Sequence, residues 1–436
     1  MRKRIAAAEK AAAMMACYST RAARERHQLE RFNAIWKTAR ENVPFYRAWQ
    51  VKCGLPDAIG SLGELKDWPI LTKGDLRNLD DFRRKDVAYP RNVCLTGGST
   101  GEPVRLPAWK DLPSGVSQMI GRRAYGIEPG DRTFLLWGHE HLYGTGVRRR
   151  IAASVRQLKD WLAGWTRVSA YDLGADVLHR AYAKLVRIRP KFVIGFSPAV
   201  LAFVRQNAEH AHEVSSVHAI LCTAGPLTSD EKQEIIDFFT PIPNPRSLIP
   251  ELCMEYGSVE CGVMAYTRPV DGEYEVFWNT HLIQARKQDD GEYRNLVTRL
   301  TDCYVPLIRY DIGDYLDCPD NADSVHHLRS VKGRPSEMIR FACGVSFFGA
   351  LIGDCVKQVT DVIASQIAVD EAGDCLEIRV VATRVLSGKD LALVSDRFSL
   401  VVKDAERLRV NVVQVDKLFT TIGGKTPRVV RERLKS

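Results

Sequence analysis

The chain has 436 residues, of which 45% are hydrophobic and 26% charged, and its formal net charge is +9. This length predicts two or three domains, and the composition is that of a soluble globular protein with enough apolar material for a sizeable core. No apolar run reaches eighteen residues, which argues against a membrane span, and eleven scattered cysteines without a CxxC pair argue against a disulfide framework. We therefore expect a cytoplasmic protein with no membrane partner.

The first 28 residues are rich in alanine and predict an exposed helical extension. Their basic start resembles a signal peptide, but Glu9 and Lys10 interrupt an apolar run that is too short for one. Apolar residues then recur at helical spacing, at Leu29, Phe32, Ile35, Trp36 and Ala39. This spacing predicts an amphipathic helix that must end before Pro44, because proline cannot continue a helix.

A short apolar edge, "VCL", leads into the stretch "TGGSTGEP" at residues 96–103. Such a run can present backbone N–H groups and hydroxyls to an anion, so it is a candidate phosphate cradle. Alone the signal is weak, because glycine-rich turns are common and the Gly-Lys-Ser/Thr of a Walker loop is missing here. The candidate residues are Thr96, Gly97, Gly98, Ser99, Thr100 and Gly101.

From residue 131 to 330, short apolar runs alternate with helical patterns. The runs "RTFLLW", "KFVIGF" and "VHAILCTAG" predict buried strands, and the capping-box pattern from Thr228 to Glu231 predicts a helix that runs through Phe239. This alternation predicts an α/β domain with a largely parallel sheet. After Gly333 the pattern of apolar and polar residues changes. The stretches "CLEIRVVAT" and "LRVNVVQV" predict two strands with a helix between them.

Two stretches place residue types suited to a nucleotide at short spacing. In "EYGSVE", the ring of Tyr256 could stack on a purine, Gly257 allows close backbone approach, and Glu260 could hold Mg²⁺. In "RYDIGD", Asp314 on a glycine turn could accept both hydroxyls of a ribose. Each pattern alone is equally typical of an ordinary turn or a solvated loop.

Two cations follow. Arg334 lies in "KGRPSEMIR", where the chain changes character, and Lys425 lies on the glycine pair of "TTIGGKTPR". The second stretch contains Gly-Lys-Thr, but Phe419 stands where a Walker loop needs glycine, and Pro427 stands where a helix should follow. Singly, either cation could be an ordinary surface residue. Support for a nucleotide site therefore comes from the order and separation of all these stretches.

In that order, the chain resembles the adenylate-forming superfamily of acyl-CoA synthetases, adenylation domains and luciferases. "TGGSTGEP" is similar to the family's phosphate loop, "YGSVE" to its Tyr-Gly-x-Thr-Glu motif, and "RYDIGD" to its Tyr-Arg-Thr-Gly-Asp segment. "KGRPSEMIR" resembles its hinge and "TTIGGKTPR" its terminal Gly-Lys-x-x-Arg. The stretches "ENVPFYR" and "LKDWPILTKGDLR" resemble the phenylacetate-CoA ligase branch, and the resemblance runs from about residue 29 to 430.

The resemblance implies a large N-terminal adenylate-forming domain with parallel sheets and helices, and a small mobile C-terminal α+β domain. We expect a helical extension at 1–28, an ATP- and acid-binding domain at 29–333 and a lid domain at 334–436. The lid would rotate after adenylation, about a pivot just behind the Gly-Arg pair.

The implied reaction joins a carboxylate to ATP, releases pyrophosphate and then passes the acyl group to a thiol, first of all to coenzyme A. Lys425, Glu260 and Arg334 would be catalytic, with Mg²⁺ on Glu260. The implied ATP-binding residues are Thr96 to Gly101, Ala224, Gly225, Pro226, Tyr256, Gly257, Ser258, Val259, Asp314 and Arg334.

The sequence departs from the family pattern at several points. Val259 replaces a threonine, Glu102 a frequent lysine, Gly225 a glutamate, and Ser336 the usual aspartate or lysine of the pivot. These departures leave a degenerate adenylate-binding scaffold as an alternative. Thr267, Arg268 and Tyr274 fill the stretch where many members of the branch carry a zinc cluster, so we expect no zinc.

In this fold the carboxylate pocket would draw on three segments, with Trp137, His139, His141, Tyr143, Phe196 and Ser197 as candidates. Their aromatic rings suit an aromatic or heteroaromatic acid, although tryptophan and phenylalanine are more often core residues. The acceptor alternatives are an amine or a carrier-protein thiol, and a homodimer is an option. The net charge raises nucleic-acid binding as a further hypothesis, but no basic run of five and no aromatic-interleaved basic ribbon appear, so no nucleic-acid partner is expected.

Overall fold

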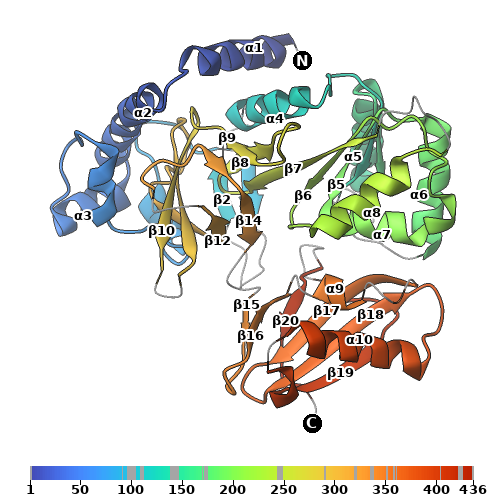
Figure 1. Ribbon diagram of the computed structural model, residues 1–436. Helices are drawn as coiled ribbons and strands as arrows, with labels where there is room; N and C mark the ends of the chain where they lie inside the picture. The colour runs from blue at the N-terminus through green and yellow to red at the C-terminus, as the bar shows by residue number, and fades with distance from the viewer. Residues whose placement is uncertain are drawn as a thin grey trace. The chain divides into compact units, whose positions relative to one another are not determined.

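The chain forms two compact units (Figure 1). Unit 1 comprises residues 1–128 and 253–333, and unit 2 comprises residues 129–252 and 334–436. No helix in the described part of the chain is long and apolar enough to cross a membrane. The computed structural model describes residues 2–90, 92–95, 105–108, 112–137, 147–168, 170, 175–242, 249–288, 291–318, 322–333, 338–349, 352–356, 359, 361–402, 404–420 and 426–434.

The helices of unit 1 are α1 (Arg2–Cys17), α2 (Arg21–Asn42), α3 (Pro44–Cys53) and α4 (Leu112–Ala124). The helical character predicted for the first 28 residues is confirmed, but α1 covers only Arg2–Cys17 of them and Arg21 to Gln28 belong to α2. The predicted amphipathic helix is confirmed as α2, which buries Phe32, Ile35 and Trp36 and ends before Pro44. Pro44 then opens α3 at a position where its missing N–H is not needed.

Three antiparallel groups of strands belong to unit 1. The first group pairs β1 (Asn92–Leu95) with β2 (Arg105–Ala108). The second group consists of β7 (Glu251–Ser258), whose first residues lie in unit 2, β8 (Gly262–Thr267), β9 (Tyr274–Val276) and β13 (His327–Leu328). The third group consists of β10 (His281–Lys287), β11 (Tyr293–Arg299), β12 (Tyr310–Asp317) and β14 (Ser330–Gly333). The predicted apolar edge "VCL" is confirmed within β1.

A buried polar network fixes α2 to these strands. Gln28 is fully buried, and its Nε2 donates to the carbonyl oxygens of Trp278 (3.0 Å) and His281 (3.1 Å). Ser324 Oγ donates to Gln28 Oε1 at 2.6 Å and lies 2.9 Å from His326 Nε2. Because the serine hydroxyl has one proton and gives it to Gln28, the histidine donates to the serine.

In unit 2, residues 129–252 form the predicted parallel sheet, in the order β6-β5-β3-β4. Its strands alternate with helices along the chain, as the sequence predicts. The elements are β3 (Thr133–Leu136), α5 (Val147–Leu162), β4 (Trp165–Val168), α6 (Ala175–Ile188), β5 (Phe192–Phe196), α7 (Ser197–Gln206), β6 (Ala219–Thr223) and α8 (Ser229–Phe239). The capping box is confirmed: Thr228 Oγ1 accepts from Glu231 N at 3.2 Å, and Thr228 N donates to Glu231 at 2.9 Å.

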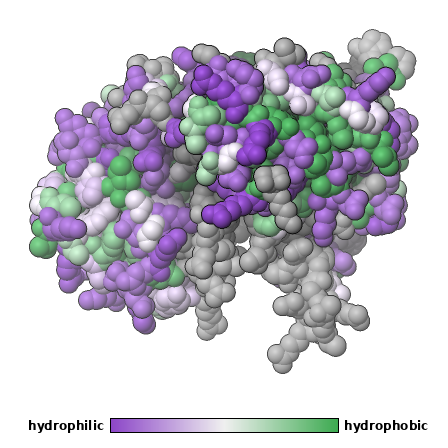
Figure 2. All heavy atoms as spheres, turned by 90° about the horizontal axis from the view of Figure 1, so that it is seen from below, coloured by the Kyte–Doolittle hydropathy of each residue, from purple (hydrophilic) through white to green (hydrophobic). Residues whose placement is uncertain are grey.

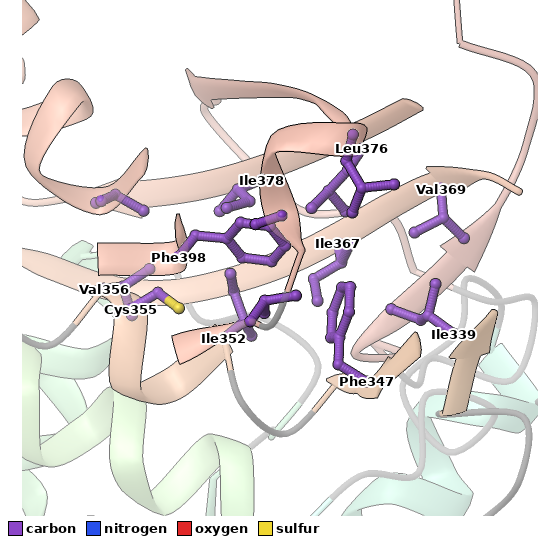
Figure 3. Close-up of a cluster of buried hydrophobic side chains, with 14 of the residues drawn as sticks. Ile339, Phe347, Ile352, Cys355, Val356, Ile367, Val369, Leu376, Ile378 and Phe398 are labelled. Carbon is purple, nitrogen blue, oxygen red and sulfur yellow. The ribbon is translucent and has the colours of Figure 1, made fainter. Parts of the chain in front are cut away.

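The C-terminal part is a small α+β structure with its own hydrophobic core (Figure 3). Ile367 and Ile378 of its central strands face Phe398 of α10 and Phe347 of β16 in this core. The predicted strands and the helix between them are confirmed as β18, β19 and α10. The elements are β15 (Met338–Arg340), β16 (Ser346–Phe348), α9 (Ile352–Val356), β17 (Val362–Asp370), β18 (Cys375–Ala382), α10 (Gly388–Val401), β19 (Arg409–Gln414) and β20 (Val429–Arg431).

The structure therefore confirms the predicted fold class, a large part with a parallel sheet and helices followed by a small C-terminal α+β part. Hydrophilic side chains cover much of the face drawn in Figure 2, with hydrophobic ones between them. Unit 1 ends at Gly333, but the predicted three-part division into extension, large domain and lid stays a prediction.

Candidate nucleotide site

The β7–β8 hairpin carries the Tyr-Gly motif at its tip. Gly262 has φ +77°, a left-handed conformation that favours glycine, and Ser258 Oγ accepts a hydrogen bond from Cys261 N at 3.0 Å. A Cβ on Gly257 would lie 2.7 Å from the carbonyl oxygen of Gly262, so any side chain there would force the two strands apart. The hairpin thus depends on both glycines to present Glu260.

Glu260 is 9% exposed, and no hydrogen bond or ion pair engages its carboxylate among the described residues. Its backbone oxygen accepts from Arg299 Nη1 at 3.3 Å. A buried carboxylate without a partner costs free energy unless a cation compensates it. One such carboxylate together with substrate phosphates is a typical environment for Mg²⁺, so Glu260 fits the predicted metal ligand.

Tyr256 and Asp314 are brought into direct contact. The phenol of Tyr256 donates to Asp314 Oδ2 at 2.7 Å, and Asn295 Nδ2 donates to the phenol oxygen at 2.9 Å. All three side chains are buried. Burial, and then the negative charge of Asp314, raise the pKa of Tyr256 well above its ordinary value, so the phenol stays protonated. The predicted adenine-stacking ring and the predicted ribose acceptor therefore form one unit.

The backbone around Asp314 is held from two sides. Gly313 has φ +78°, and its N–H donates to Asp311 Oδ1 at 3.0 Å, which makes the turn before Asp314. Leu71 N donates to the carbonyl oxygen of Arg309 at 3.2 Å, and Asp311 N donates to that of Leu71 at 2.8 Å. Leu71 belongs to "LKDWPILTKGDLR", so this branch-specific stretch positions the aspartate motif.

The other branch-specific stretch, "ENVPFYR", has a similar role. Tyr46 is fully buried, and its phenol donates to the carbonyl oxygen of Pro306 at 2.6 Å. Its ring meets that of Trp36 edge to face, with 6.2 Å between centroids. Burial raises the pKa of Tyr46 well above its ordinary value, which keeps the phenol a donor. The segment leading to the aspartate motif is thus anchored to α2 and α3.

In unit 2, Trp137 and Phe196 lie at the carboxyl ends of neighbouring parallel strands, with ring centroids 4.6 Å apart. This edge of a parallel sheet is where α/β proteins usually bind ligands. A Cβ on Gly195 would lie 2.7 Å from Val200 Cγ2 and 2.9 Å from Leu136 Cβ, so only glycine fits beside Phe196.

The hydroxyl of Ser197 is fully buried and bonds to the chain itself. Its Oγ lies 2.7 Å from the carbonyl oxygen of Gly225 and 3.1 Å from that of Thr223. Ala224 has φ +64°, a conformation that costs free energy for a residue with a side chain. Ser197 thus holds the strained turn that carries the predicted adenine-edge residues Ala224 to Pro226.

Three residues of the site were missed by sequence reasoning. Asn295 contacts Tyr256, Arg299 contacts the Glu260 backbone, and His281 Nε2 donates to the carbonyl oxygen of Cys261 at 2.9 Å. His281 and Arg299 are partners in the β10–β11 register, which brings both to the hairpin tip. No local pattern marks them, because this pairing joins segments that are distant in the sequence.

The remaining predicted site residues lie outside the described part of the chain: Thr96, Gly97, Gly98, Ser99, Thr100, Gly101, His139, His141, Tyr143, Arg334 and Lys425.

Comparison with curated proteins finds relatives of similar length, although no protein-family model matches the chain. The chain is 21% identical to protein CapK from Staphylococcus aureus, over 91% of the chain and 87% of that protein. It is 24% identical to the phenylacetate-coenzyme A ligase of Escherichia coli K12, over 72% of the chain and 71% of the ligase. It is 35% identical to the phenylacetate-coenzyme A ligase of Aromatoleum evansii, over 120 residues that make up 26% of the chain and 27% of that ligase.

Solved structures extend the comparison to the fold. A 2-hydroxyisobutyryl-CoA ligase in its postadenylation state, in complex with an acyl-AMP, matches with a TM-score of 0.68 at 14% identity, over 95% of the chain and 91% of the ligase. An anthranilate-CoA ligase in complex with anthranoyl-AMP matches with a TM-score of 0.51 at 15% identity, over 77% of the chain and 65% of that ligase. The chain therefore has the fold of the adenylate-forming ligases. The sequence relatives include phenylacetate-coenzyme A ligases, so both comparisons agree with the predicted resemblance to the phenylacetate-CoA ligase branch of the adenylate-forming superfamily.

Proposed function

We propose that this chain activates an aromatic or heteroaromatic carboxylic acid with ATP and passes the acyl group to coenzyme A. The observation that carries this proposal is the bond between Tyr256 and Asp314, 58 positions apart, in a chain with the adenylate-forming fold. A ring of a kind that stacks on adenine and a carboxylate of a kind that binds ribose are then direct neighbours, which supports a site for one nucleoside. The contact between Trp137 and Phe196 supports a planar acid.

In the first step, a carboxylate oxygen of the acid bonds to the α-phosphorus of ATP, and the bond to the β-phosphate oxygen breaks. Two anions must meet, so the site has to neutralise charge and align the attacking oxygen. Glu260 would hold Mg²⁺, which supplies charge neutralisation on the phosphate oxygens. Asp314 would orient the ribose, and Thr96 to Gly101 would receive the β- and γ-phosphates.

In the second step, the thiolate of coenzyme A bonds to the acyl carbon, the bond to the AMP oxygen breaks, and the thiol proton leaves to solvent. Arg334 would lie near the ribose hydroxyls. Lys425 would bind both the acid and the α-phosphate during the first step only. These two roles follow from the resemblance of their motifs.

Exchange of radiolabelled pyrophosphate into ATP, with a panel of acids, tests the first step. We expect exchange that depends on both Mg²⁺ and an acid, and the acyl-CoA product identified by mass spectrometry when coenzyme A is added. Formation of an amide or an acylated carrier protein, with no acyl-CoA, would show a different acceptor. An absence of exchange with every acid would contradict the proposal.

The matched variant for this assay is Glu260→Gln, which keeps the size of the side chain and removes its charge. We expect exchange to fall by about 100-fold, because a positioned charge at the reacting phosphates is lost. The thermal midpoint should not fall, since the variant removes a buried unpartnered charge. A Glu260→Gln enzyme with unchanged exchange would exclude Glu260 as the metal ligand.

A further inference from the structure

Helix α5 of unit 2 turns large apolar side chains toward solvent. Val155 is 46% exposed, Leu158 56%, Trp161 73% and Leu162 70%. Three of them follow helical spacing on one side, and Trp161 lies one turn from Leu158. We refer to these four side chains as the α5 apolar stripe. A single exposed leucine needs no explanation, but a continuous stripe on one helix does.

Between Ser154 and Leu162, the opposite side of α5 carries Arg156 and Asp160 and faces the protein. Asp160 is the only buried residue between Ser154 and Leu162. Its carboxylate accepts hydrogen bonds from Arg167 of the edge strand β4, at 2.9 and 3.3 Å, and forms an ion pair with Arg156 at 3.2 Å. The helix is thus attached to the sheet by an ion pair, where apolar side chains usually make this contact. The apolar side of α5 faces outward instead.

The next helix shows that this arrangement is specific to α5. Helix α6 buries its apolar residues Leu178, Ala181, Tyr182 and Leu185 at the same kind of spacing. The two helices belong to the same sheet unit, and each has one apolar and one polar side. Only α6 uses its apolar side to build the core, so the α5 apolar stripe is available to something else.

The charge of α5 indicates which kind of partner the α5 apolar stripe binds. The segment "VRRRIAASVRQLKDWL" contains five basic residues and one acidic residue. Lys159 is exposed next to the stripe, whereas Arg156 is paired with Asp160 on the protein side. By sequence, Arg148 to Arg150 belong to the first turn of the helix. A helix with exposed tryptophan and leucine side chains on one side and a net positive charge is typical of segments that lie in the interface of an anionic bilayer.

We propose that α5 docks on an anionic lipid surface, with the α5 apolar stripe among the acyl chains and Lys159 at the headgroups. The stripe is small for a contact with a second copy of the chain, because four side chains of one helix offer roughly a few hundred Å², while a stable interface buries about 600 Å² or more on each partner. This proposal departs from the sequence-based expectation of no membrane partner. That expectation rested on the length of apolar runs, whereas the proposal rests on the side of α5 that its apolar residues occupy.

Sedimentation of the full-length protein with vesicles tests the proposal. We expect the protein to sediment with vesicles of phosphatidylcholine and phosphatidylglycerol, less so at high salt, and not with phosphatidylcholine alone. The double variant Leu158→Glu/Leu162→Glu should lose at least about tenfold in vesicle affinity, because charges cannot enter the acyl region. The control Val51→Glu, which alters an 81% exposed valine of α3, should bind like the wild type. Pyrophosphate exchange should be equal in all three proteins.

Absence of binding by the wild type, or equal binding by the double variant, would overturn the proposal. A wild-type dimer that does not bind vesicles and that the double variant converts to monomer would assign the stripe to a second copy instead. A second readout uses Trp161, one of eight tryptophans. Anionic vesicles should shift wild-type tryptophan emission to shorter wavelength, and Trp161→Phe should bind the vesicles without most of that shift.

Discussion

At the scale of single residues, Tyr256 couples two tasks. Its ring is of a kind that stacks on a purine, and its phenol holds the carboxylate of Asp314 at 2.7 Å. Because burial and Asp314 raise the pKa of Tyr256, the phenol remains a donor over the whole physiological range. The ring and the carboxylate are therefore oriented together, and Asn295 Nδ2 donates a further hydrogen bond to the phenol oxygen.

Tyr256→Phe separates these tasks, since it keeps the ring and removes the donor. We expect the KM for ATP to rise about tenfold with a smaller change in kcat, which corresponds to about 1.4 kcal/mol, a typical value for a hydrogen bond to a charged group. Initial rates of pyrophosphate exchange at varied ATP measure this. The control is Tyr125→Phe, which removes another buried phenol, bonded to the Thr267 carbonyl at 2.6 Å, and should lower thermal stability without changing the KM. Equal KM values for Tyr256→Phe and wild type would refute the coupling.

At the scale of elements, α2 is the clearest case of a helix fixed by polar contacts as well as by an apolar side. Its Gln28 binds two backbone carbonyls and, through Ser324, His326. Burial, and then the charges of Arg24 and Arg21, lower the pKa of His326 to about 4. His326 is therefore neutral in the folded protein at pH 7, with its one ring proton on Nε2, from which it donates to Ser324.

This lowered pKa predicts acid sensitivity of the α2 attachment. The unfolded chain takes up a proton on His326 near pH 6.5 and the folded chain only near pH 4, so stability is lost as the pH falls between these values. Between pH 7 and pH 5 the loss should be up to about 2 kcal/mol. Urea unfolding at both pH values measures it, and His326→Gln, which cannot take up the proton, should lose less by that amount. The same pH dependence in both proteins would show that another group is responsible.

At the scale of the whole molecule, distant segments cooperate within unit 1. Tyr46 of α3 holds the chain at Pro306, and Leu71 holds it at Arg309 and Asp311 through a β-bridge, so α3 and the segment around Leu71 position the aspartate motif. The assignment of residues 334–436 as a lid that delivers Lys425 stays a prediction from motif resemblance.

Lys425→Ala tests that prediction. We expect pyrophosphate exchange to fall by at least about 100-fold, because a charge that stabilises the reacting phosphate is removed. Formation of the thioester from a supplied acyl-AMP and coenzyme A should continue at a rate near that of the wild type. Exchange that continues unaltered in Lys425→Ala would remove this lysine from the reaction, and loss of both steps with a lowered thermal midpoint would indicate a structural role.

The sequence by itself determined the elements whose signals are local. Pro44 ends α2, the box from Thr228 to Glu231 opens α8, and alternating apolar runs predict the strands of the parallel sheet, because each signal acts within a few residues of the backbone. The ordered motifs likewise predicted Tyr256, Glu260 and Asp314, whose residue types are chemically suited to a nucleotide. Only the tertiary structure decided that Tyr256 bonds to Asp314, that the β10–β11 register brings Arg299 and His281 to the hairpin, and that the apolar side of α5 faces outward. Contacts of this kind depend on strand register and on which side of an element meets its neighbour, and neither is encoded within a single short segment.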